Sequence, residues 1–515
     1  MHTIHAASLD WALQHLILEG DGDLFPRPFE IDVIKGSWNA LKQDLLGVDV
    51  AKHQWQPVQN VLVPKEELSF RRACQMEPLD SVLFSAITYE IGGAIEARRR
   101  PTTEQSVFSY RFSPQPDGSM YAKGNPWKDF WSTSVIRANK GQFVATLDIS
   151  DFYNQIYHHA IENQLDSSGV NADLKRALLN ILKLASANVS RGVPVGPHAS
   201  HLLAEMSLIS LDDYLHLKGY SYSRFVDDIH IFCNSHELAQ AAVYEVADFL
   251  DKSQKLSLNK QKTEVLTSET FTRRASLMLV DNPINQEEKT ILKIIQFHAG
   301  PYTKIVLDQL SPADLELLKN ADIGGVLESY LNTESPNYVR LRWFLRRLSQ
   351  TGIPSAVEYV VTNLQKLLPA IGDTAAYLNS AKDSYKGDWP QLGTALLHAL
   401  QLTVVLKNEY LQIVLLSLFS RVSPLNHIGK LVQSFESYGN LAKRQIILAA
   451  RETAQATPWL QNLKSSIGNM DPWQRRALLF ASVQVPKDER KHWLQSIQGY
   501  LSPLEKAIAD LVKTA

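Results

Sequence analysis

The hydrophobic and polar positions in the centre of the chain, residues 140–265, follow alternating strand-like and helix-like patterns. Residues 143–147 form a short, mostly apolar run that is typical of a buried strand, and the chain then turns into a helix through Ile156. Two further apolar runs, 220–226 and 229–233, are separated by only two polar residues, which predicts a β-hairpin. The centre of the chain is therefore expected to combine strands and helices.

The flanking regions are predicted to be helical. Short helical patterns fill residues 1–65, and a longer helix is expected from Pro78 to Ile95. Beyond about residue 285, amphipathic helices of about 12–18 residues recur between Pro, Gly and Asn residues. The clearest examples are residues 338–348, 410–419, 441–451 and 473–481. Helix pairs of this kind favour an α-helical, HEAT-like repeat, with a plain helical bundle as the alternative.

Composition narrows the class of protein. The 515 residues include 52 Lys and Arg against 54 Asp and Glu, so any basic groove for nucleic acid must be local. Two cysteines are too few for a disulfide framework or a Cys-rich zinc site, and they fit a reducing cytoplasm. The N-terminus lacks the apolar core of a secretory signal, and the most apolar stretch, 396–419, is interrupted by charged residues. No membrane span is expected.

Two adjacent acids, Asp227 and Asp228, occupy the turn of the predicted hairpin. Neighbouring carboxylates repel each other, and a positive group must compensate when they lose water. A divalent metal ion is the natural candidate, because hard cations prefer carboxylate oxygens. This arrangement points to phosphate chemistry, whereas a plain turn is the alternative for the pair taken alone.

A third acid, Asp148, follows the predicted strand at 143–147 and precedes a helix. Strand ends of this kind concentrate the chemistry of α/β sites. If the two strands lie side by side, Asp148 and Asp227 could bind two Mg²⁺ ions that activate a 3′-hydroxyl and stabilise pyrophosphate. A helix N-cap is the alternative for Asp148 alone, but the three acids together favour a metal site.

Further motifs surround the acids. The loop 191–197 contains two glycines and two prolines and leads into a predicted helix over 198–214, whose N–H groups could face phosphate. An ordinary strand-to-helix turn is the alternative. After a predicted helix at 236–252, Lys262 is a candidate general acid for pyrophosphate departure, with a solvated surface lysine as the alternative.

Two arginine-rich segments allow two interpretations each. Arg98–Arg100 is most typical of a solvated helix end, and less so of a phosphate contact. The arginines of 338–348 flank an apolar stripe, so they could cover the rim of the core or line a groove for a single strand. The rim is slightly favoured.

In order and spacing, these motifs resemble the palm of reverse transcriptases over roughly 60–265. Leu147-Asp-Ile-Ser-Asp-Phe-Tyr153 is similar to the first acidic motif of that family, and Gly192-Val-Pro-Val-Gly-Pro197 to its Gly/Pro loop. Phe225-Val-Asp-Asp228 is a variant of the tyrosine-x-Asp-Asp motif, and Asn259-Lys-Gln-Lys-Thr263 resembles the lysine motif that follows. The resemblance implies a right-hand polymerase that uses Mg²⁺ or Mn²⁺ and dNTP substrates.

Carried over by position, the resemblance implies roles for single residues. Asp148, Asp227 and Asp228 would be metal ligands, with Lys262 beside them as a catalytic residue. Tyr153, five residues after Asp148, would be the steric gate that stacks under the sugar and rejects a 2′-hydroxyl.

Further nucleotide-binding positions are implied at Ile149, Phe152 and Gly196. Arg72 would be the finger residue that grips the triphosphate, a role for which Arg71 competes.

The resemblance also implies a domain order for an α+β protein. An N-terminal helical segment at 1–65 would pack on the polymerase, the fingers and palm would cover 66–275, and the all-α repeat domain would cover 285–515. A palm followed by helical repeats is similar to the bacterial anti-phage, abortive-infection group of reverse transcriptases. That group implies template-independent DNA synthesis primed by a protein hydroxyl, single-stranded DNA attached to the protein, and a homo-oligomer.

One departure affects how a template would be read. The family usually has Gln in its Gly/Pro loop where this chain has Val195, and the loss removes a hydrogen-bonding group that faces nucleotide or template. Two alternatives remain at this point: a conventional RNA-templated DNA polymerase similar to retron or intron enzymes, and a helical interaction scaffold with an inactive palm.

Overall fold

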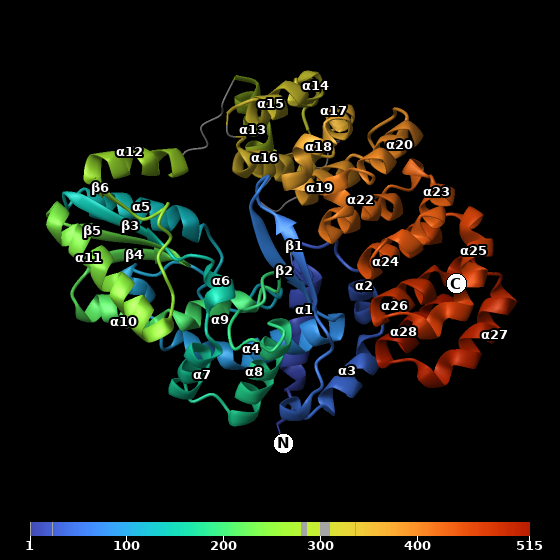
Figure 1. Ribbon diagram of the computed structural model, residues 1–515, viewed down its shortest axis with the longest axis horizontal. Helices are drawn as coiled ribbons and strands as arrows, with labels where there is room; N and C mark the ends of the chain where they lie inside the picture. The colour runs from blue at the N-terminus through green and yellow to red at the C-terminus, as the bar shows by residue number, and fades with distance from the viewer. Residues whose placement is uncertain (1, 23, 280–285, 299–309, 335, 515) are drawn as a thin grey trace. The chain divides into compact units, whose positions relative to one another are not determined.

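The computed structural model describes residues 2–22, 24–279, 286–298, 310–334 and 336–514 (Figure 1). The chain divides into two compact units. The first consists of Met1–Asp23, Arg27–Asn60 and Ala73–Asn282, and the second of Leu24–Pro26, Val61–Arg72 and Pro283–Ala515. The predicted start of the helical domain, residue 285, lies outside the described residues.

A four-stranded antiparallel sheet forms the centre of the first unit. Its strands are β3 (Phe143–Asp148), β4 (Ser221–Phe225), β5 (Asp228–Cys233) and β6 (Glu264–Thr267), in the order β4-β5-β3-β6. The predicted strands at 143–147 and 229–233 and the hairpin between β4 and β5 are confirmed. The register places Asp148 of β3 opposite Asp228 of β5.

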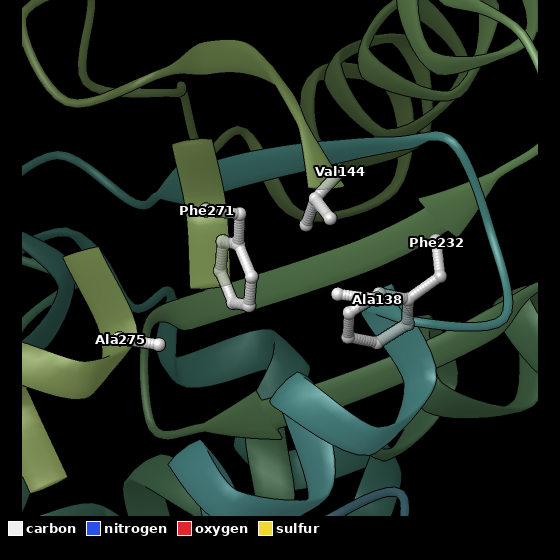
Figure 2. Packing of buried hydrophobic residues seen from close by; sticks show 5 residues of the cluster. All are labelled: Ala138, Val144, Phe232, Phe271 and Ala275. Carbon is white, nitrogen blue, oxygen red and sulfur yellow. The ribbon is translucent and has the colours of Figure 1, made fainter. Parts of the chain in front are cut away.

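Helices cover both faces of this sheet. On one face, α5 (Pro126–Ala138) and α12 (Ser268–Leu279) enclose an apolar cluster, which Figure 2 shows from close by. The cluster consists of Ala138, Val144, Phe232, Phe271 and Ala275. Because side chains alternate along a strand, Phe143 faces the other way, where its ring lies against His236 of α11 (His236–Phe249).

The N-terminal helices pack within the same unit. Helix α1 (Ala6–Glu19) lies against α4 (Pro78–Glu96), which confirms the helix predicted from Pro78. The Trp11 indole N–H donates a hydrogen bond to the Gln115 carbonyl at 2.8 Å. The remaining helices of this unit are α2 (Glu30–Gly36), α3 (Trp38–Leu46), α6 (Phe152–Gln155), α7 (His158–Ser167), α8 (Ala172–Ala185), α9 (Ser200–Ser207) and α10 (Ile209–Leu217). Strands β1 (Gln59–Pro64) and β2 (Phe70–Gln75) pair with each other, and their residues within Val61–Arg72 group with the second unit.

The second unit is helical over its described residues after 286. A set of its helices packs in a row, each against the next in chain order, and Figure 1 shows this row. They are α16 (Tyr338–Thr351), α19 (Ile371–Ser380), α22 (Glu409–Arg421), α24 (Asn440–Arg451), α26 (Pro472–Ala481) and α28 (Pro503–Thr514). All four helices predicted from the amphipathic pattern are confirmed.

The other α-helices of this unit precede the row or lie between its members. They are α13 (Gln286–His298), α14 (Pro312–Asn320), α15 (Ile323–Leu331), α17 (Val357–Thr362), α18 (Leu364–Leu367), α20 (Trp389–Ala399), α21 (Thr403–Leu406), α23 (Ile428–Gln433), α25 (Thr457–Leu463) and α27 (Lys487–Ile497). Among the helices that the structure describes, none is both long and apolar enough to cross a membrane.

The arginines of α16 are engaged by neighbouring groups of the second unit. Arg340 binds the carboxylate of Glu288, and Arg346 donates a hydrogen bond to Asp373 at 2.7 Å. Arg342 donates to the Lys65 carbonyl at 2.6 Å. These contacts favour the rim interpretation of the arginine-rich segment over a groove for a single strand.

Candidate active site

The three predicted acids converge at one end of the sheet. Asp148 ends β3, Asp228 begins β5, and the two residues pair across the antiparallel ladder. Asp227 lies in the two-residue turn that joins β4 to β5. In the sequence, Asp148 lies 79 residues before Asp227 and 80 before Asp228. The strand pairing thus brings the three carboxylates together.

The acids interact electrostatically. Burial raises the pKa of Asp228 from 3.8 to about 7, and the negative charges of Asp227 and Asp148 add to this effect. Asp148 itself is only 5% exposed. Near neutral pH, Asp228 is therefore only partly ionised unless a cation approaches.

Lys262 is the cation that the structure places in this group. Its Nζ lies 2.7 Å from Oδ2 of Asp148. Burial lowers the pKa of Lys262, but the hydrogen bond to Asp148 and the charges of the acids outweigh this effect and raise it above 10.5. Lys262 therefore keeps its proton at neutral pH, as a general acid requires.

The donor set fits a hard divalent cation by its chemistry. All three groups are carboxylates, and the charges of Asp227 and Asp148 add to burial in raising the pKa of Asp228. In the part of the chain that the structure describes, however, no group of three or more His, Cys, Asp and Glu residues has an arrangement ready to hold a metal ion. One oxygen of Asp148 is instead directed to Lys262.

The acidic turn has an unusual backbone. Val226 has φ +54°, a left-handed conformation that is strained for a β-branched residue. Two buried side chains hold its peptide groups. The Val226 N–H donates to Ser109 Oγ at 2.8 Å, and the Val226 carbonyl accepts a hydrogen bond from Arg224 at 2.9 Å.

Arg224 and Ser109 are both bonded to buried charged side chains, which form an ionic cluster. Arg224 binds Asp212 through two hydrogen bonds of 2.8 and 2.6 Å and lies 3.0 Å from Glu205. Glu205 accepts hydrogen bonds from Ser109 at 2.5 Å and from Arg99 at 2.7 Å. Removing one partner of such a cluster leaves an uncompensated buried charge, which costs about 3–5 kcal/mol.

This cluster is not evident from the pattern of the sequence. Arg99 was expected at a solvated helix end, but it is only 4% exposed and bridges Glu205 and the backbone of Ser109. Its neighbour Arg98 is exposed, as expected. The signal that could have revealed the cluster is Arg224, a charged residue inside an otherwise strand-like run.

The Gly/Pro loop lies against the C-terminal end of strand β2. The Cys74 N–H donates to the Val195 carbonyl at 2.7 Å. Gly196 has φ +136°, and a Cβ at this position would meet the Cys74 carbonyl oxygen at 2.6 Å, so only glycine fits. On the other side, the Val193 N–H donates to the Tyr153 carbonyl at 2.8 Å.

The residues after Asp148 follow the predicted turn into a short helix, α6. Ile149 and Phe152 are buried, 1% and 3% exposed, so their side chains serve the core and only their backbone could face a nucleotide. Tyr153 is half-buried, and its Oη lies 2.6 Å from Nδ1 of His201. The helix predicted over 198–214 is present as two helices, α9 and α10, which are separated at Leu208.

Arg72 is not brought into this group. It lies on β2 in the stretch Val61–Arg72, which groups with the second unit, and its side chain is exposed. Its competitor Arg71 shares both properties. The triphosphate-binding role of Arg72 stays a prediction.

The comparison with protein families decides the type of domain. Residues 95–292 match the model of the family described as reverse transcriptase (RNA-dependent DNA polymerase). The chain contains a reverse-transcriptase domain. Asp148, Asp227, Asp228 and Lys262 all lie within the matched residues, whereas Arg72 lies outside them.

Comparison with solved structures gives distant similarities. A telomerase from Candida albicans, in complex with a fragment of telomeric RNA, has a TM-score of 0.32 and 12% identity over 78% of this chain and 70% of that chain. An apo telomerase from Candida Tropicalis has a TM-score of 0.34 and 12% identity over 89% and 73%. An RdRp complex has a TM-score of 0.30 and 12% identity over 94% and 44%. No curated protein matches the chain significantly.

Proposed function

We propose that this protein is a Mg²⁺-dependent DNA polymerase of the reverse-transcriptase type that acts in bacterial anti-phage defence. The observation that carries the proposal is the meeting of Asp148, Asp227 and Asp228 beside Lys262 within a reverse-transcriptase domain. Crowded carboxylates are costly for a fold, as the raised pKa of Asp228 indicates, which argues against a palm that has lost its chemistry.

The residues divide the chemistry between them. The three carboxylates would hold two Mg²⁺ ions, which supply charge to activate a 3′-hydroxyl and to stabilise pyrophosphate. Lys262, charged at neutral pH, would donate a proton to the departing pyrophosphate. Tyr153 would lie under the sugar as the steric gate, and the backbone of Ile149, Phe152 and Gly196 would approach the nucleotide.

Synthesis without a template is the finer part of the proposal. It rests on Val195, which has an apolar side chain and a backbone carbonyl already bonded to Cys74. This part of the loop therefore offers no side-chain hydrogen bond to a template. A hydroxyl of the protein would then serve as primer and leave single-stranded DNA attached to the chain.

The defence role rests on the helical second unit and on the resemblance of the sequence to the abortive-infection group. Helices from α16 to α28 pack in a row, as in a HEAT-like repeat, and rows of this kind offer extended surfaces for protein contacts. A homo-oligomer in the cytoplasm belongs to the same proposal.

The test is incorporation of labelled dNTPs by purified protein with Mg²⁺, with and without an RNA template. Asp148→Asn and Asp227→Asn should each lower incorporation by more than about 100-fold, because they remove carboxylates that would hold the Mg²⁺ ions. Asp248→Asn, which removes an exposed carboxylate that pairs with Lys252, is the matched control and should incorporate normally.

The outcomes separate the alternatives. Label that migrates with the protein in the absence of RNA supports protein-primed, template-independent synthesis. Incorporation that needs RNA would favour a conventional RNA-templated polymerase. No incorporation by the wild-type protein, with normal phage defence by Asp227→Asn, would favour a scaffold with an inactive palm.

A further inference from the structure

We propose that His201 positions Tyr153 and thereby sets the selectivity of the site for the sugar of the incoming nucleotide. This inference rests on the proposed polymerase function and adds to it a residue outside the acidic motifs. It starts from the hydrogen bond of 2.6 Å between Tyr153 Oη and His201 Nδ1.

The Tyr153 hydroxyl can donate this hydrogen bond when Nδ1 of His201 carries no proton. Burial raises the pKa of Tyr153 well above 10, and neighbouring groups that include Asp227 add to the effect. The phenol therefore keeps its proton at neutral pH and can donate it to Nδ1 of His201. Tyr153 also lies on α6, the first helix after the strand that ends in Asp148.

The imidazole of His201 is fixed by aromatic neighbours. Its ring stacks on Tyr110 with centroids 3.9 Å apart and an angle of 5° between the planes. The Tyr110 backbone has φ +42°, and its carbonyl accepts a hydrogen bond from Arg99 at 2.7 Å. Arg99 of the buried ionic cluster thus holds the backbone of Tyr110. Because the His201 ring stacks on Tyr110, it has little freedom to rotate.

The start of helix α9 fixes the backbone of His201. The Tyr121 hydroxyl donates to the His198 carbonyl at 2.7 Å and accepts a hydrogen bond from the Leu202 N–H at 3.1 Å. One turn further along α9, Glu205 binds Ser109 and Arg99. Residues four apart on a helix share a face, so α9 supports the tyrosine and the acidic turn together.

A fixed Tyr153 ring discriminates better than a mobile one. A ring that can tilt away would leave room for a 2′-hydroxyl, whereas a ring held at its hydroxyl end excludes the larger sugar. The hydrogen bond to His201 is thus expected to act on selectivity between nucleotides more than on the chemical step.

The experiment measures kcat/KM for a dNTP and for the matching rNTP with the full-length protein and Mg²⁺. His201→Phe keeps a ring to stack on Tyr110 but removes the acceptor. It should lower the dNTP preference by about fivefold to tenfold, which corresponds to one lost hydrogen bond. Tyr153→Phe should have a similar effect, and the double variant should lose no more than either single variant, because both remove the same bond.

Two further variants separate positioning from folding. His201→Gln restores an acceptor and should recover part of the preference. His159→Phe, which replaces a histidine whose side chain is 84% exposed, is the control and should match the wild type. A general loss of folded protein would lower both nucleotide activities equally and leave their ratio unchanged.

The result that overturns the inference is wild-type selectivity in His201→Phe while Tyr153→Ala accepts rNTPs. The proposed function would survive that result, because the steric gate would still act. A wild-type protein that incorporates neither nucleotide would instead contradict the proposed function and this inference with it.

Discussion

Burial shifts the pKa of several titratable side chains of the first unit. His15 is one case outside the acidic site: it is 2% exposed, and its Nδ1 lies 2.8 Å from the Gly118 carbonyl. Burial lowers its pKa from 6.5 to about 4, in spite of that hydrogen bond. Burial has the opposite effect on the carboxylate of Asp228, because it raises the pKa of that group.

The pKa of His15 predicts sensitivity to acid. Below pH 6.5 the unfolded chain takes up a proton that the folded protein excludes, so stability falls as the pH approaches 4. The full difference corresponds to about 3 kcal/mol. His15→Gln keeps an N–H donor for Gly118 and should flatten the fall, which urea unfolding at pH 7, 6, 5 and 4 would measure.

The control for this measurement is His159→Gln, which changes an exposed histidine in the same unit. An equal acid sensitivity in wild type and His15→Gln would show that His15 does not contribute. Because the effect is a difference between two pH values, a constant packing loss in the variant does not obscure it.

At the scale of elements, the acidic hairpin depends on segments that are distant in sequence. The turn at Val226 contacts Ser109, which precedes α5, and Ser109 contacts Glu205 on α9. Arg224 of β4 holds the Val226 carbonyl, but the Val226 N–H is held by Ser109, which lies outside the hairpin. The position of the acidic turn is therefore a property of three segments together.

Removal of the Ser109 hydroxyl tests this dependence. Ser109→Ala leaves the Val226 N–H and a carboxylate oxygen of Glu205 each short of a partner, so it should cost about 1–3 kcal/mol of stability. It should also lower kcat for dNTP incorporation more than it changes KM. Chemical denaturation and steady-state kinetics would measure the two effects.

Ser81→Ala is the matched control, because Ser81 is also buried but its hydroxyl has no hydrogen-bond partner among the described residues. It should be close to neutral in stability and activity. Equal effects of the two substitutions would show that the hydroxyl of Ser109 has no special role at the turn.

At the scale of the whole molecule, the two units differ in how their contacts are distributed. The sheet of the first unit joins strands that are far apart in sequence. The row from α16 to α28 is instead built from helices that are close together in sequence. In such a row, stability propagates from one helix to the next, and the terminal helix has fewer neighbours.

This organisation predicts a local response to substitutions near the C-terminal end. Ile446→Val in α24 and Ile508→Val in α28 remove the same methyl group from fully buried sites, and each should cost about 0.5–1.5 kcal/mol. Hydrogen exchange should show faster opening around α28 for Ile508→Val, and along several helices for Ile446→Val. An equally wide response to both would contradict nearest-neighbour stacking.

The sequence predicts those features that depend on local pattern. The strand ending at Asp148, the hairpin at Asp227 and the amphipathic helices after 338 follow from the periodicity of apolar residues. The α+β class with a helical C-terminal region is confirmed as well. The acidic motifs could be found because few other positions place carboxylates at strand ends.

Features that depend on distant contacts could not be predicted. The burial of Arg99 follows from Glu205, more than a hundred residues away, and no local pattern announces it. The break at Leu208 contains neither Gly nor Pro, so tertiary packing rather than propensity ends α9 there. The contact between Tyr153 and His201 likewise joins two motifs that appear independent in sequence.

The packing of the N-terminal helix limits where the polymerase can be cut. The family match begins at residue 95, yet the unit that contains the acids also includes α1 and α4. Gly118, inside the match, lies so close to the backbone of α1 that a Cβ there would meet the Gln14 carbonyl carbon at 2.5 Å. A recombinant fragment spanning only 95–292 would expose to solvent the surface that packs against α1, and it would be poorly soluble. Biochemical work should therefore keep the N-terminal residues.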